Sequence, residues 1–468
     1  MAATVSSSRH GCFVRLIAAA AVLAAFGIGA AARPEERVLL NVDSLFPAAS
    51  CHTPQEHEPS AATPGRMRII HRHGPCSPLA NAHGMPPSHA EILAADQNRV
   101  ESIQRRVMTG KRAGPKKNPS LSASKLATGS YVVTVGLGTP ASPQTVVFDT
   151  GSDTMWVQCR PCVADGCYKQ KQRLFDPAKS STYANVSCGD PACRDLAIGG
   201  CTGGRCQYTL HYGDGSSSVG FYGRDTLTIA QDAIKGFRFG CGQNNSLLGN
   251  QAGLMGLGRG KTSLPVQAFD RYRGVFSYCL PASSSATTGY LHLGPDASTA
   301  NASLTPILTA RGPTFYYVGL TAIRVDGQQV SIPESVLSTA GMVVDSGTSI
   351  TRLPATAYAA LSKAFAAAMA ARGYKKAPAF PTLDTCYNST GISEAALPVV
   401  SLVFRGGASL DVDKSGIMFQ TGEAQACLAF MSNGDDVTFG ILGNLQQKTY
   451  GMLFDIGKST VGFAPGAC

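Results

Sequence analysis

Residues 146–152 read Val-Val-Phe-Asp-Thr-Gly-Ser, and residues 342–348 read Met-Val-Val-Asp-Ser-Gly-Thr. Each stretch is an apolar run, typical of a buried strand, that ends in Asp, a hydroxyl residue and Gly. About a hundred residues after each stretch, an apolar pair is followed by Gly, at residues 254–256 and 441–443. One such triplet is a common turn. Two copies in the same ordered context predict a duplicated fold with two similar lobes.

The two carboxylates, Asp149 and Asp345, are the candidate catalytic residues. Amide hydrolysis without a metal or a covalent nucleophile needs a base to deprotonate water and an acid to protonate the peptide. Two carboxylates held close together can do both, because their like charges cannot both ionise easily and they share a proton. Small neighbours would let the two backbones approach, and hydroxyls would hold the carboxylates in place. The residues expected to give this support are Gly151, Ser152, Gly347 and Thr348.

The remainder of the chain predicts an all-β protein with four segments. Strand patterns begin at Tyr131 and recur to the end, interrupted by an alanine-rich helix at about residues 356–372 that Gly373 closes. We expect an N-terminal lobe at residues 128–300 and a C-terminal lobe at residues 301–468. Residues 1–32 read as a signal peptide, with Arg9 and Arg15 before an apolar stretch that ends in three alanines. The alternative is a membrane anchor, but the stretch is short, and no second apolar run predicts a membrane span.

Residues 33–127 differ in composition from residues 128–468 and read as a removable propeptide. They hold six of the nine histidines, a helical pattern at about residues 89–108 and a basic stretch at residues 111–117. Residues 1–127 contain 15 Lys and Arg against 8 Asp and Glu, whereas residues 128–468 contain 25 against 22. The excess positive charge therefore belongs to the N-terminal part, which argues against a nucleic-acid surface on the mature protein. The alternative is a disordered tail without an inhibitory role.

Cysteine usage indicates an oxidising compartment. Twelve of the fifteen cysteines come after residue 128, which suits six disulfides in a secreted protein. Zinc is the alternative at Cys159 and Cys162, but only two histidines come after residue 128. We expect no metal and no cofactor. Four glycosylation acceptors fit the same compartment, at Asn185, Asn244, Asn301 and Asn388.

Over residues 128–468, the chain resembles the pepsin-like aspartic proteases, and among them the plant nepenthesin-like group. Residues 149–157 match the first active-site signature, and residues 211–216 (His-Tyr-Gly-Asp-Gly-Ser) match the flap hairpin. Residues 441–465 match the C-terminal end, and the cysteine-rich stretch at residues 159–206 looks like the insertion of the nepenthesin-like group. The resemblance implies a bilobal double β-barrel with an active-site cleft between the lobes.

The resemblance also assigns roles to individual residues. Tyr212 and Gly213 would belong to the flap over the substrate, and Trp156 would hydrogen-bond the Tyr212 hydroxyl. Without the resemblance, Tyr212 is a strand residue beside a turn and Trp156 a core aromatic. Asp214 places a carboxyl in the flap, where many pepsins have a neutral residue. The implied disulfides are Cys159–Cys162, Cys167–Cys241, Cys188–Cys206, Cys193–Cys201, Cys279–Cys468 and Cys386–Cys427.

We therefore expect an aspartic endopeptidase that is made as a zymogen, acts on polypeptides at acidic pH and is a monomer. Its own basic propeptide would inhibit it by pairing with the cleft carboxylates at neutral pH. The expected location is the secretory pathway and the cell wall or apoplast, with the vacuole or the plastid as alternatives. Two other functions stay open: a binding protein on the same fold, as in relatives that inhibit glycosidases, and a DNA-binding protein.

Overall fold

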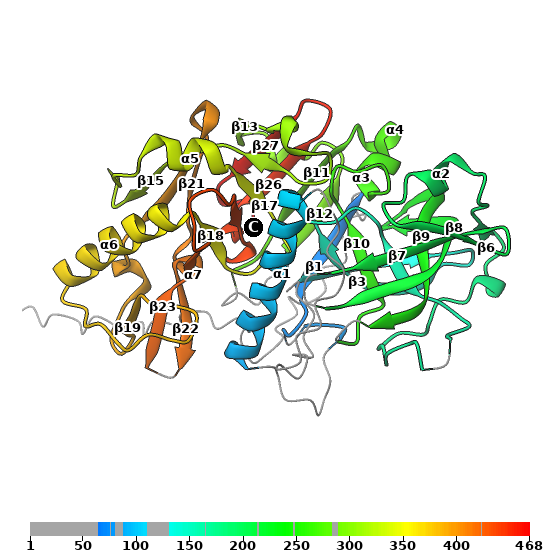
Figure 1. Ribbon diagram of the computed structural model, residues 1–468, viewed down its shortest axis with the longest axis horizontal. Coiled ribbons are helices and arrows are strands. Elements are labelled where there is room, and N and C mark those ends of the chain that lie inside the picture. Colours follow the sequence, from blue (N-terminus) through cyan, green and yellow to red (C-terminus); the bar gives the residue numbers. More distant parts are fainter. Residues whose placement is uncertain are drawn as a thin grey trace, which may run out of the picture. The chain divides into compact units, whose positions relative to one another are not determined.

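The computed structural model describes residues 64–74, 76–79, 88–109, 131–163, 165–212, 215–246, 249–282, 289–422 and 424–468 (Figure 1). The predicted signal peptide, the basic stretch at residues 111–117, Gly213 and Asp214 lie outside the described residues. Within the described part, strands dominate, as predicted for an all-β protein.

The largest sheet contains fifteen of the described strands and runs through both halves of the chain. Its order is β13-β27-β26-β11-β12-β1-β2-β3-β10-β4-β9-β8-β7-β6, with β5 paired to β8. The strands are β1 (Arg66–His71), β2 (Tyr131–Leu137), β3 (Ser142–Asp149), β4 (Trp156–Gln158), β5 (Ala184–Asn185), β6 (Gly199–Thr202), β7 (Arg205–His211), β8 (Ser217–Ile229), β9 (Asp232–Ser246), β10 (Gly253–Gly256), β11 (Val275–Cys279), β12 (Gly289–Leu293), β13 (Ser303–Pro306), β26 (Gly451–Asp455) and β27 (Thr460–Ala464).

The second half of the chain also forms three smaller sheets among the described residues. Five strands take the order β14 (Tyr317–Val318), β17 (Met342–Val344), β25 (Gly440–Leu442), β18 (Thr351–Leu353) and β24 (Phe430–Ser432). Four take the order β16 (Gln328–Gln329), β15 (Leu320–Val325), β20 (Val400–Phe404) and β21 (Ser409–Asp411), and three the order β19 (Cys386–Asn388), β23 (Gln425–Leu428) and β22 (Met418–Gly422).

Helices are few, and two of them are long. The predicted alanine-rich helix is α6 (Ala355–Ala371), which buries Tyr358, Leu361, Phe365 and Met369 at helical spacing. It ends at Gly373, whose φ of 77° is the left-handed conformation that glycine adopts without strain. The other long helix is α1 (His89–Thr109), close to the predicted 89–108. The shorter helices are α2 (Pro191–Arg194), α3 (Leu264–Gln267), α4 (Phe269–Tyr272), α5 (Glu334–Ala340) and α7 (Lys414–Ile417).

The repeated sequence motif forms the same pair of parallel strands in both halves of the chain. Strand β3 pairs in parallel with β10, and β17 pairs in parallel with β25, so each apolar-Gly segment lies beside a strand that leads to an Asp. Gly256 lies opposite Asp149, and the Asp345 amide donates to the Leu442 carbonyl at 3.1 Å. Parallel strands that are buried on both faces require continuous apolar runs, which explains the Val-rich composition of both stretches.

One strand of the large sheet was not predicted. Strand β1, from the segment that reads as a propeptide, pairs antiparallel with β12 through Arg66–Ile69 and with β2 through Ile70 and His71. Ile69 is fully buried there. The alternative of a disordered tail is therefore wrong for β1 and α1, both of which pack against the rest of the chain.

The disulfide pairing predicted from the resemblance is only partly right. Among the described residues, Cys279–Cys468 and Cys386–Cys427 form as predicted. The other four predicted pairs are wrong, because the structure contains Cys159–Cys241, Cys162–Cys167, Cys188–Cys201 and Cys193–Cys206.

Strand pairing explains the difference. Strand β4 runs parallel to β9, with Val157 opposite Cys241, and this brings Cys159 beside Cys241. In the β6–β7 hairpin, Cys201 lies directly opposite Cys206. Each of these two cysteines forms its disulfide with a cysteine from outside the hairpin. The buried Cys206 is bonded to Cys193 of α2. Such contacts depend on tertiary structure and are not readable from spacing.

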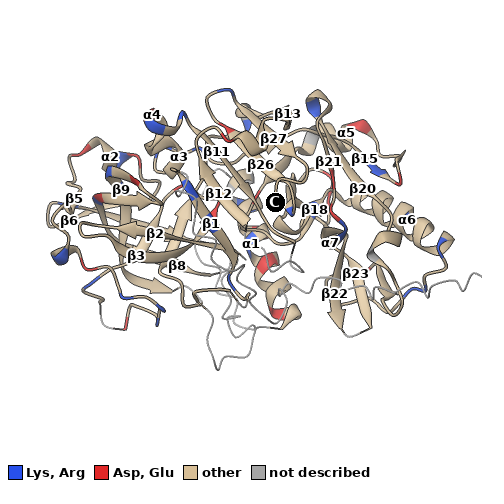
Figure 2. Cartoon of the chain, turned by 180° about the vertical axis from the view of Figure 1, so that it is seen from behind, with Lys and Arg blue, Asp and Glu red and all other residues tan. Residues whose placement is uncertain are grey.

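Charges are scattered over the chain. Seen from behind, Lys and Arg are interspersed with Asp and Glu along the elements of both halves (Figure 2). Of the helices that are described, none is long and apolar enough to span a membrane.

Candidate active site

The two candidate catalytic residues lie at the ends of equivalent strands and are joined by reciprocal hydrogen bonds between their neighbours. The Thr150 amide donates to the Ser346 hydroxyl at 3.1 Å, and the Ser346 amide donates to the Thr150 hydroxyl at 2.9 Å. Thr150 also donates its hydroxyl proton to the Val344 carbonyl at 3.1 Å. These bonds connect the two loops across the molecule and fix the relative position of the carboxylates.

Each carboxylate is held in the same way by its own loop. The Ser152 hydroxyl donates to Asp149 Oδ2 at 2.6 Å, and the Thr348 hydroxyl donates to Asp345 Oδ2 at 2.5 Å. Both Asp Oδ1 atoms accept an amide N–H at 3.0 Å, from Gly151 and Gly347 respectively. Charge-assisted bonds of this kind are the stronger protein hydrogen bonds. The four supporting residues expected from the sequence therefore all contact the carboxylates.

The two glycines are required by the closeness of the carboxylates. A Cβ atom on Gly151 would lie 2.7 Å from Asp345 Oδ1, and one on Gly347 would lie 2.5 Å from Asp149 Oδ1. Both distances are shorter than a side chain tolerates, so any larger residue would push one loop away from the other carboxylate.

A third charged residue, which the sequence had not singled out, lies between the carboxylates. Arg99 of α1 places Nη2 2.7 Å from Asp149 Oδ1 and 2.9 Å from Asp345 Oδ1. Its Nε atom donates to Asp345 Oδ2 at 3.1 Å. All three side chains are buried. One guanidinium nitrogen thus binds both carboxylates at once, which the planar fork of Arg permits.

The environment gives the two carboxyls different pKa values. Burial raises the pKa of Asp345, and the neighbouring Asp149 carboxylate raises it further, against the opposing effect of Arg99. Burial also acts to raise the pKa of Asp149, but Arg99, the Ser152 hydroxyl and the Gly151 amide together hold it below its ordinary value. With Arg99 in place, the two carboxyls are therefore inequivalent, because the pKa of Asp345 is raised and that of Asp149 is lowered.

Helix α1 presents one face to the site. Leu93, Val100 and Ile103 are buried on this face. Leu93 packs with Ile350 and its neighbours, whereas Val100 and Ile103 pack with Tyr317 and other residues of the second half. In Figure 1, the helix crosses the middle of the molecule, and its contacts with the dyad place it over the site.

A signal for Arg99 exists in the sequence. Leu93, Asp96, Val100 and Ile103 have the three-and-four spacing of a buried helical stripe, and Arg99 lies beside it. A helix that carries an Asp and an Arg within its apolar face needs buried partners of opposite charge. The sequence could not identify these partners, because they lie far from α1 along the chain.

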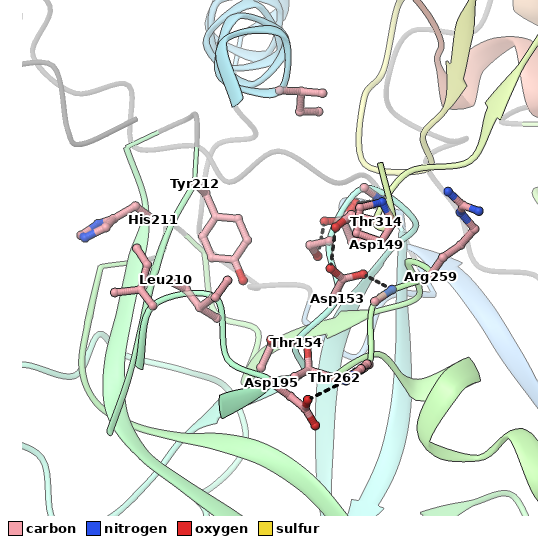
Figure 3. Close-up of a pocket in the computed structure, with 18 of the residues that line it drawn as sticks. Asp149, Asp153, Thr154, Asp195, Leu210, His211, Tyr212, Arg259, Thr262 and Thr314 are labelled. Atoms are coloured by element: carbon pink, nitrogen blue, oxygen red, sulfur yellow. Dashed lines mark hydrogen bonds and ion pairs between the residues drawn. The ribbon is translucent and has the colours of Figure 1, made fainter. Parts of the chain in front are cut away.

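A cavity of about 480 Å³ lies next to the dyad. Asp149 and Tyr212 line it from opposite sides, together with Asp153, Thr314 and Leu210 (Figure 3). The Asp153 carboxylate accepts bonds from the Gly260 amide at 2.8 Å and the Thr314 hydroxyl at 2.9 Å, which fixes one wall. The space is large enough for side chains of a bound peptide.

The hairpin of β7 and β8 carries Tyr212. The Trp156 indole donates to the Tyr212 hydroxyl at 2.8 Å, the contact that the family resemblance implied. Trp156 is fully buried and Tyr212 half-buried. The bond orients the Tyr212 ring at the cavity. Gly213 and Asp214 lie outside the described residues, so their part in the hairpin stays a prediction.

The four sequon asparagines, Asn185, Asn244, Asn301 and Asn388, are all exposed. Over the described ranges, no group of three or more His, Cys, Asp or Glu side chains is placed to hold a metal ion. The arrangement at the dyad supplies acid–base groups, a polar pocket and a partly covered cavity.

Comparison with known proteins gives consistent matches over most of the chain. The family model described as xylanase inhibitor N-terminal matches residues 131–295, and the model described as xylanase inhibitor C-terminal matches residues 315–465. An aspartyl protease family protein of Arabidopsis thaliana is 41% identical over 454 residues, covering 94% of this chain and 95% of that protein.

Two further relatives have similar names. Aspartyl protease AED1 of Arabidopsis thaliana is 38% identical over 436 residues, 92% of each chain. Aspartic proteinase nepenthesin-2 of Nepenthes gracilis is 34% identical over 396 residues, 79% of this chain and 86% of that protein. Among solved structures, edgp superposes with a TM-score of 0.60 at 21% identity, covering 72% of this chain and 91% of that chain. Basic 7S globulin from soybean gives 0.57 at 22% identity, with the same shares. At these identities, the two structures establish the fold.

Proposed function

This chain belongs to the plant pepsin-like aspartic proteases, the nepenthesins among them, and we propose that it is an endopeptidase whose catalytic carboxylates are Asp149 and Asp345. It hydrolyses polypeptides at acidic pH and is made as a zymogen. The observation that carries the proposal is the closeness of the two buried carboxylates, which a single guanidinium nitrogen binds at 2.7 and 2.9 Å.

The chemistry derives from the closeness of the two carboxyls, whose like charges cannot both ionise easily, so that they share one proton. With α1 removed, a water molecule can take the position between the carboxylates that Arg99 occupies. The ionised carboxylate takes a proton from this water as the water oxygen bonds to the peptide carbonyl carbon, while the protonated carboxyl gives its proton to the carbonyl oxygen. The carboxyl that gained a proton then donates it to the peptide nitrogen as the C–N bond breaks, and the other carboxylate takes back a hydroxyl proton from the diol, which leaves a free amine and a carboxylic acid. The two together titrate as a pair. Tyr212, oriented by Trp156, covers the substrate, and the hydroxyls of Ser152 and Thr348 hold the carboxylates during the reaction.

The zymogen proposal rests on Arg99. The segment before residue 128 is inhibitory, because its helix α1 covers the dyad and its arginine binds both carboxylates. The basic stretch at residues 111–117, which the sequence suggested for this pairing, lies outside the described residues. Cleavage after α1, with subsequent loss of the helix, would expose the cavity to substrate.

The compartment proposal rests on the disulfides. Six of them among the described residues, and exposed Asn side chains at all four sequons, suit folding in the secretory pathway. We place the protein outside the cell, in the wall space. Detection of it in a vacuolar or plastid fraction of the producing tissue would contradict this location.

The dyad assignment is tested by comparing the acid-treated protein with Asp149→Asn on a denatured protein at about pH 3–5, the range in which a carboxylate dyad is half ionised. We expect the native protein to cleave and the variant to lose activity by several orders of magnitude. Asp270→Asn is the matched control, since this carboxylate is exposed on α4 and does not line the cavity. Equal cleavage by the native protein and Asp149→Asn would overturn the proposal.

A further inference from the structure

A second buried ion pair joins α1 to strand β18, a few residues after Asp345. Asp96 Oδ2 lies 3.1 Å from Arg352 Nη2, and each side chain is only 1% exposed. The Asp96 carboxylate also accepts the Ser349 amide at 2.6 Å and the Ile350 amide at 3.3 Å. Three donors from one short segment therefore converge on one carboxylate.

The partners of Arg352 change when α1 leaves. Its Nη2 atom bonds Asp96 and Gln97, and both belong to α1. Its Nη1 atom donates to the Ile350 carbonyl at 3.1 Å, and Nε is buried without a hydrogen-bond partner in the described part of the chain. Burial lowers the pKa of Arg352, an effect that the Asp96 carboxylate opposes. A buried guanidinium without its carboxylate carries a large desolvation cost, so the processed protein has a vacant place for an anion.

The position of this place relative to the reacting atoms can be estimated from helix geometry. Arg99 marks the dyad, and Asp96 precedes it by three residues on the same helix face, a spacing of about 5–6 Å between Cβ atoms. An extended peptide advances about 3.3 Å per residue and places every second side chain on one face. A substrate side chain about two residues from the scissile bond would therefore reach the place of the Asp96 carboxylate.

We propose that in the processed enzyme Arg352, with the amides of Ser349 and Ile350, forms a subsite for a substrate carboxylate, which selects Asp or Glu about two residues from the scissile bond. The inference rests on the proposed function, because it assumes that α1 is removed and that peptides bind across the dyad. In the zymogen, Asp96 occupies the subsite as an internal substitute for that substrate side chain.

The surroundings of the subsite favour one carboxylate over a larger polar group. Ile350 packs in an apolar cluster with Phe419 and Leu445, and Leu93 of α1 fills a position in the same cluster. A bound side chain would thus have an apolar stem and a single charged end, like that of Asp or Glu. A basic substrate side chain would face the Arg352 guanidinium and be rejected.

The test uses peptides that are cut at one bond and that carry either Asp or Asn at one position within three residues of that bond. At about pH 5, Asp is ionised, because its ordinary pKa is about 3.9. We expect the Asp peptide to be cleaved roughly ten-fold more efficiently at one position, mainly through a lower KM, because hydrogen bonds to charged groups are worth about a factor of ten or more. A ratio near one at every position overturns the inference, and this arm needs no variant.

Variants then assign the preference to Arg352. In Arg352→Gln, the ratio of cleavage efficiencies for the Asp and Asn peptides should fall to about one. Cleavage of the Asn peptide measures any general loss of activity. Arg352→Lys keeps the charge but not the fork, and should retain part of the ratio. It also serves if the Gln variant fails to fold. Arg324→Gln, an exposed arginine on β15, is the matched control. A full ratio in Arg352→Gln contradicts the assignment.

The two proposals fail in different ways. If the processed protein cleaves no peptide and Asp149→Asn behaves identically, the proposed function itself is wrong. If peptides are cleaved in a manner that depends on Asp149 but without acidic preference, only the subsite is wrong, and the Asp96–Arg352 pair serves solely to anchor α1.

Discussion

Single hydroxyl groups determine how closely the two loops of the dyad approach each other. The Ser346 hydroxyl accepts from the Thr150 amide at 3.1 Å and donates to the Phe148 carbonyl at 3.4 Å, so one hydroxyl contacts the other loop at two points. At the same scale, the contact between Trp156 and Tyr212 depends on one N–H and one hydroxyl.

This contact gives a prediction for individual residues. Trp156→Phe and Tyr212→Phe each remove the bond, and each should lower kcat/KM several-fold, because a typical hydrogen bond contributes about 0.5–1.5 kcal/mol. The double variant should lose less than the sum of the two, since both single changes delete the same contact. Steady-state kinetics on one peptide measures the cycle, with thermal unfolding as the stability control. Strictly additive losses would show that the bond does not orient the flap.

The element that contacts both carboxylates of the dyad is α1. Its apolar residues pack into two clusters of the second half, and its two central charges meet buried partners, Asp96 with Arg352 and Arg99 with the dyad. Buried charges of this kind stabilise only while both partners are present, because the loss of one leaves the other desolvated. The helix is thus held by contacts that a single charge change can break.

Arg99→Gln in the full-length chain tests this directly. Removal of the cation leaves two close carboxylates, and we expect α1 to be destabilised on its docking surface by about 3–5 kcal/mol, the usual cost of breaking a buried pair. The unprocessed variant should cleave a peptide substrate nearer to neutral pH than the native chain does. Arg105→Gln, the same substitution six residues further along the helix, is the matched control. Equal latency of Arg99→Gln and the native chain would exclude Arg99 as the inhibitory residue.

The pH dependence of folding stability is a property of the whole molecule. The two carboxyls contribute to it in opposite directions, because their pKa shifts have opposite signs. A lowered pKa at Asp149 stabilises the folded full-length chain above the ordinary value of about 3.9, and this stability is lost as pH falls through the folded pKa. The raised pKa of Asp345 costs stability at higher pH, and acidification relieves this cost first. Mild acid therefore leaves one carboxylate paired with Arg99, and stronger acid leaves the guanidinium alone.

The difference in Tm between the full-length chain and Arg99→Gln should accordingly be largest above the raised pKa of Asp345, where both carboxylates are ionised and Arg99 pairs with both. It should decrease as pH falls through the pKa of Asp345, and again as pH falls through the lowered pKa of Asp149. Rapid thermal scans from pH 7 to 2, with gels to verify that the chain is intact, measure it. Because the two chains contain the same other acidic groups, the contribution of those groups cancels in the difference in Tm. A difference in Tm that stays constant down to pH 2 would show that protonation of the dyad does not weaken the docking of α1.

Sequence patterns were enough to predict the duplicated strand-Asp-Gly motif, the β class, the extents of α1 and α6, and the residues that hold the two carboxylates. These features are local, since they depend on apolar periodicity and on neighbours a few residues away. The folded chain was needed to learn which cysteines pair, where β1 inserts, and that Arg99 and Asp96 meet Asp149, Asp345 and Arg352. Each of these depends on contacts between distant segments, and a buried charge in a helical stripe predicts that it has a partner but not which one.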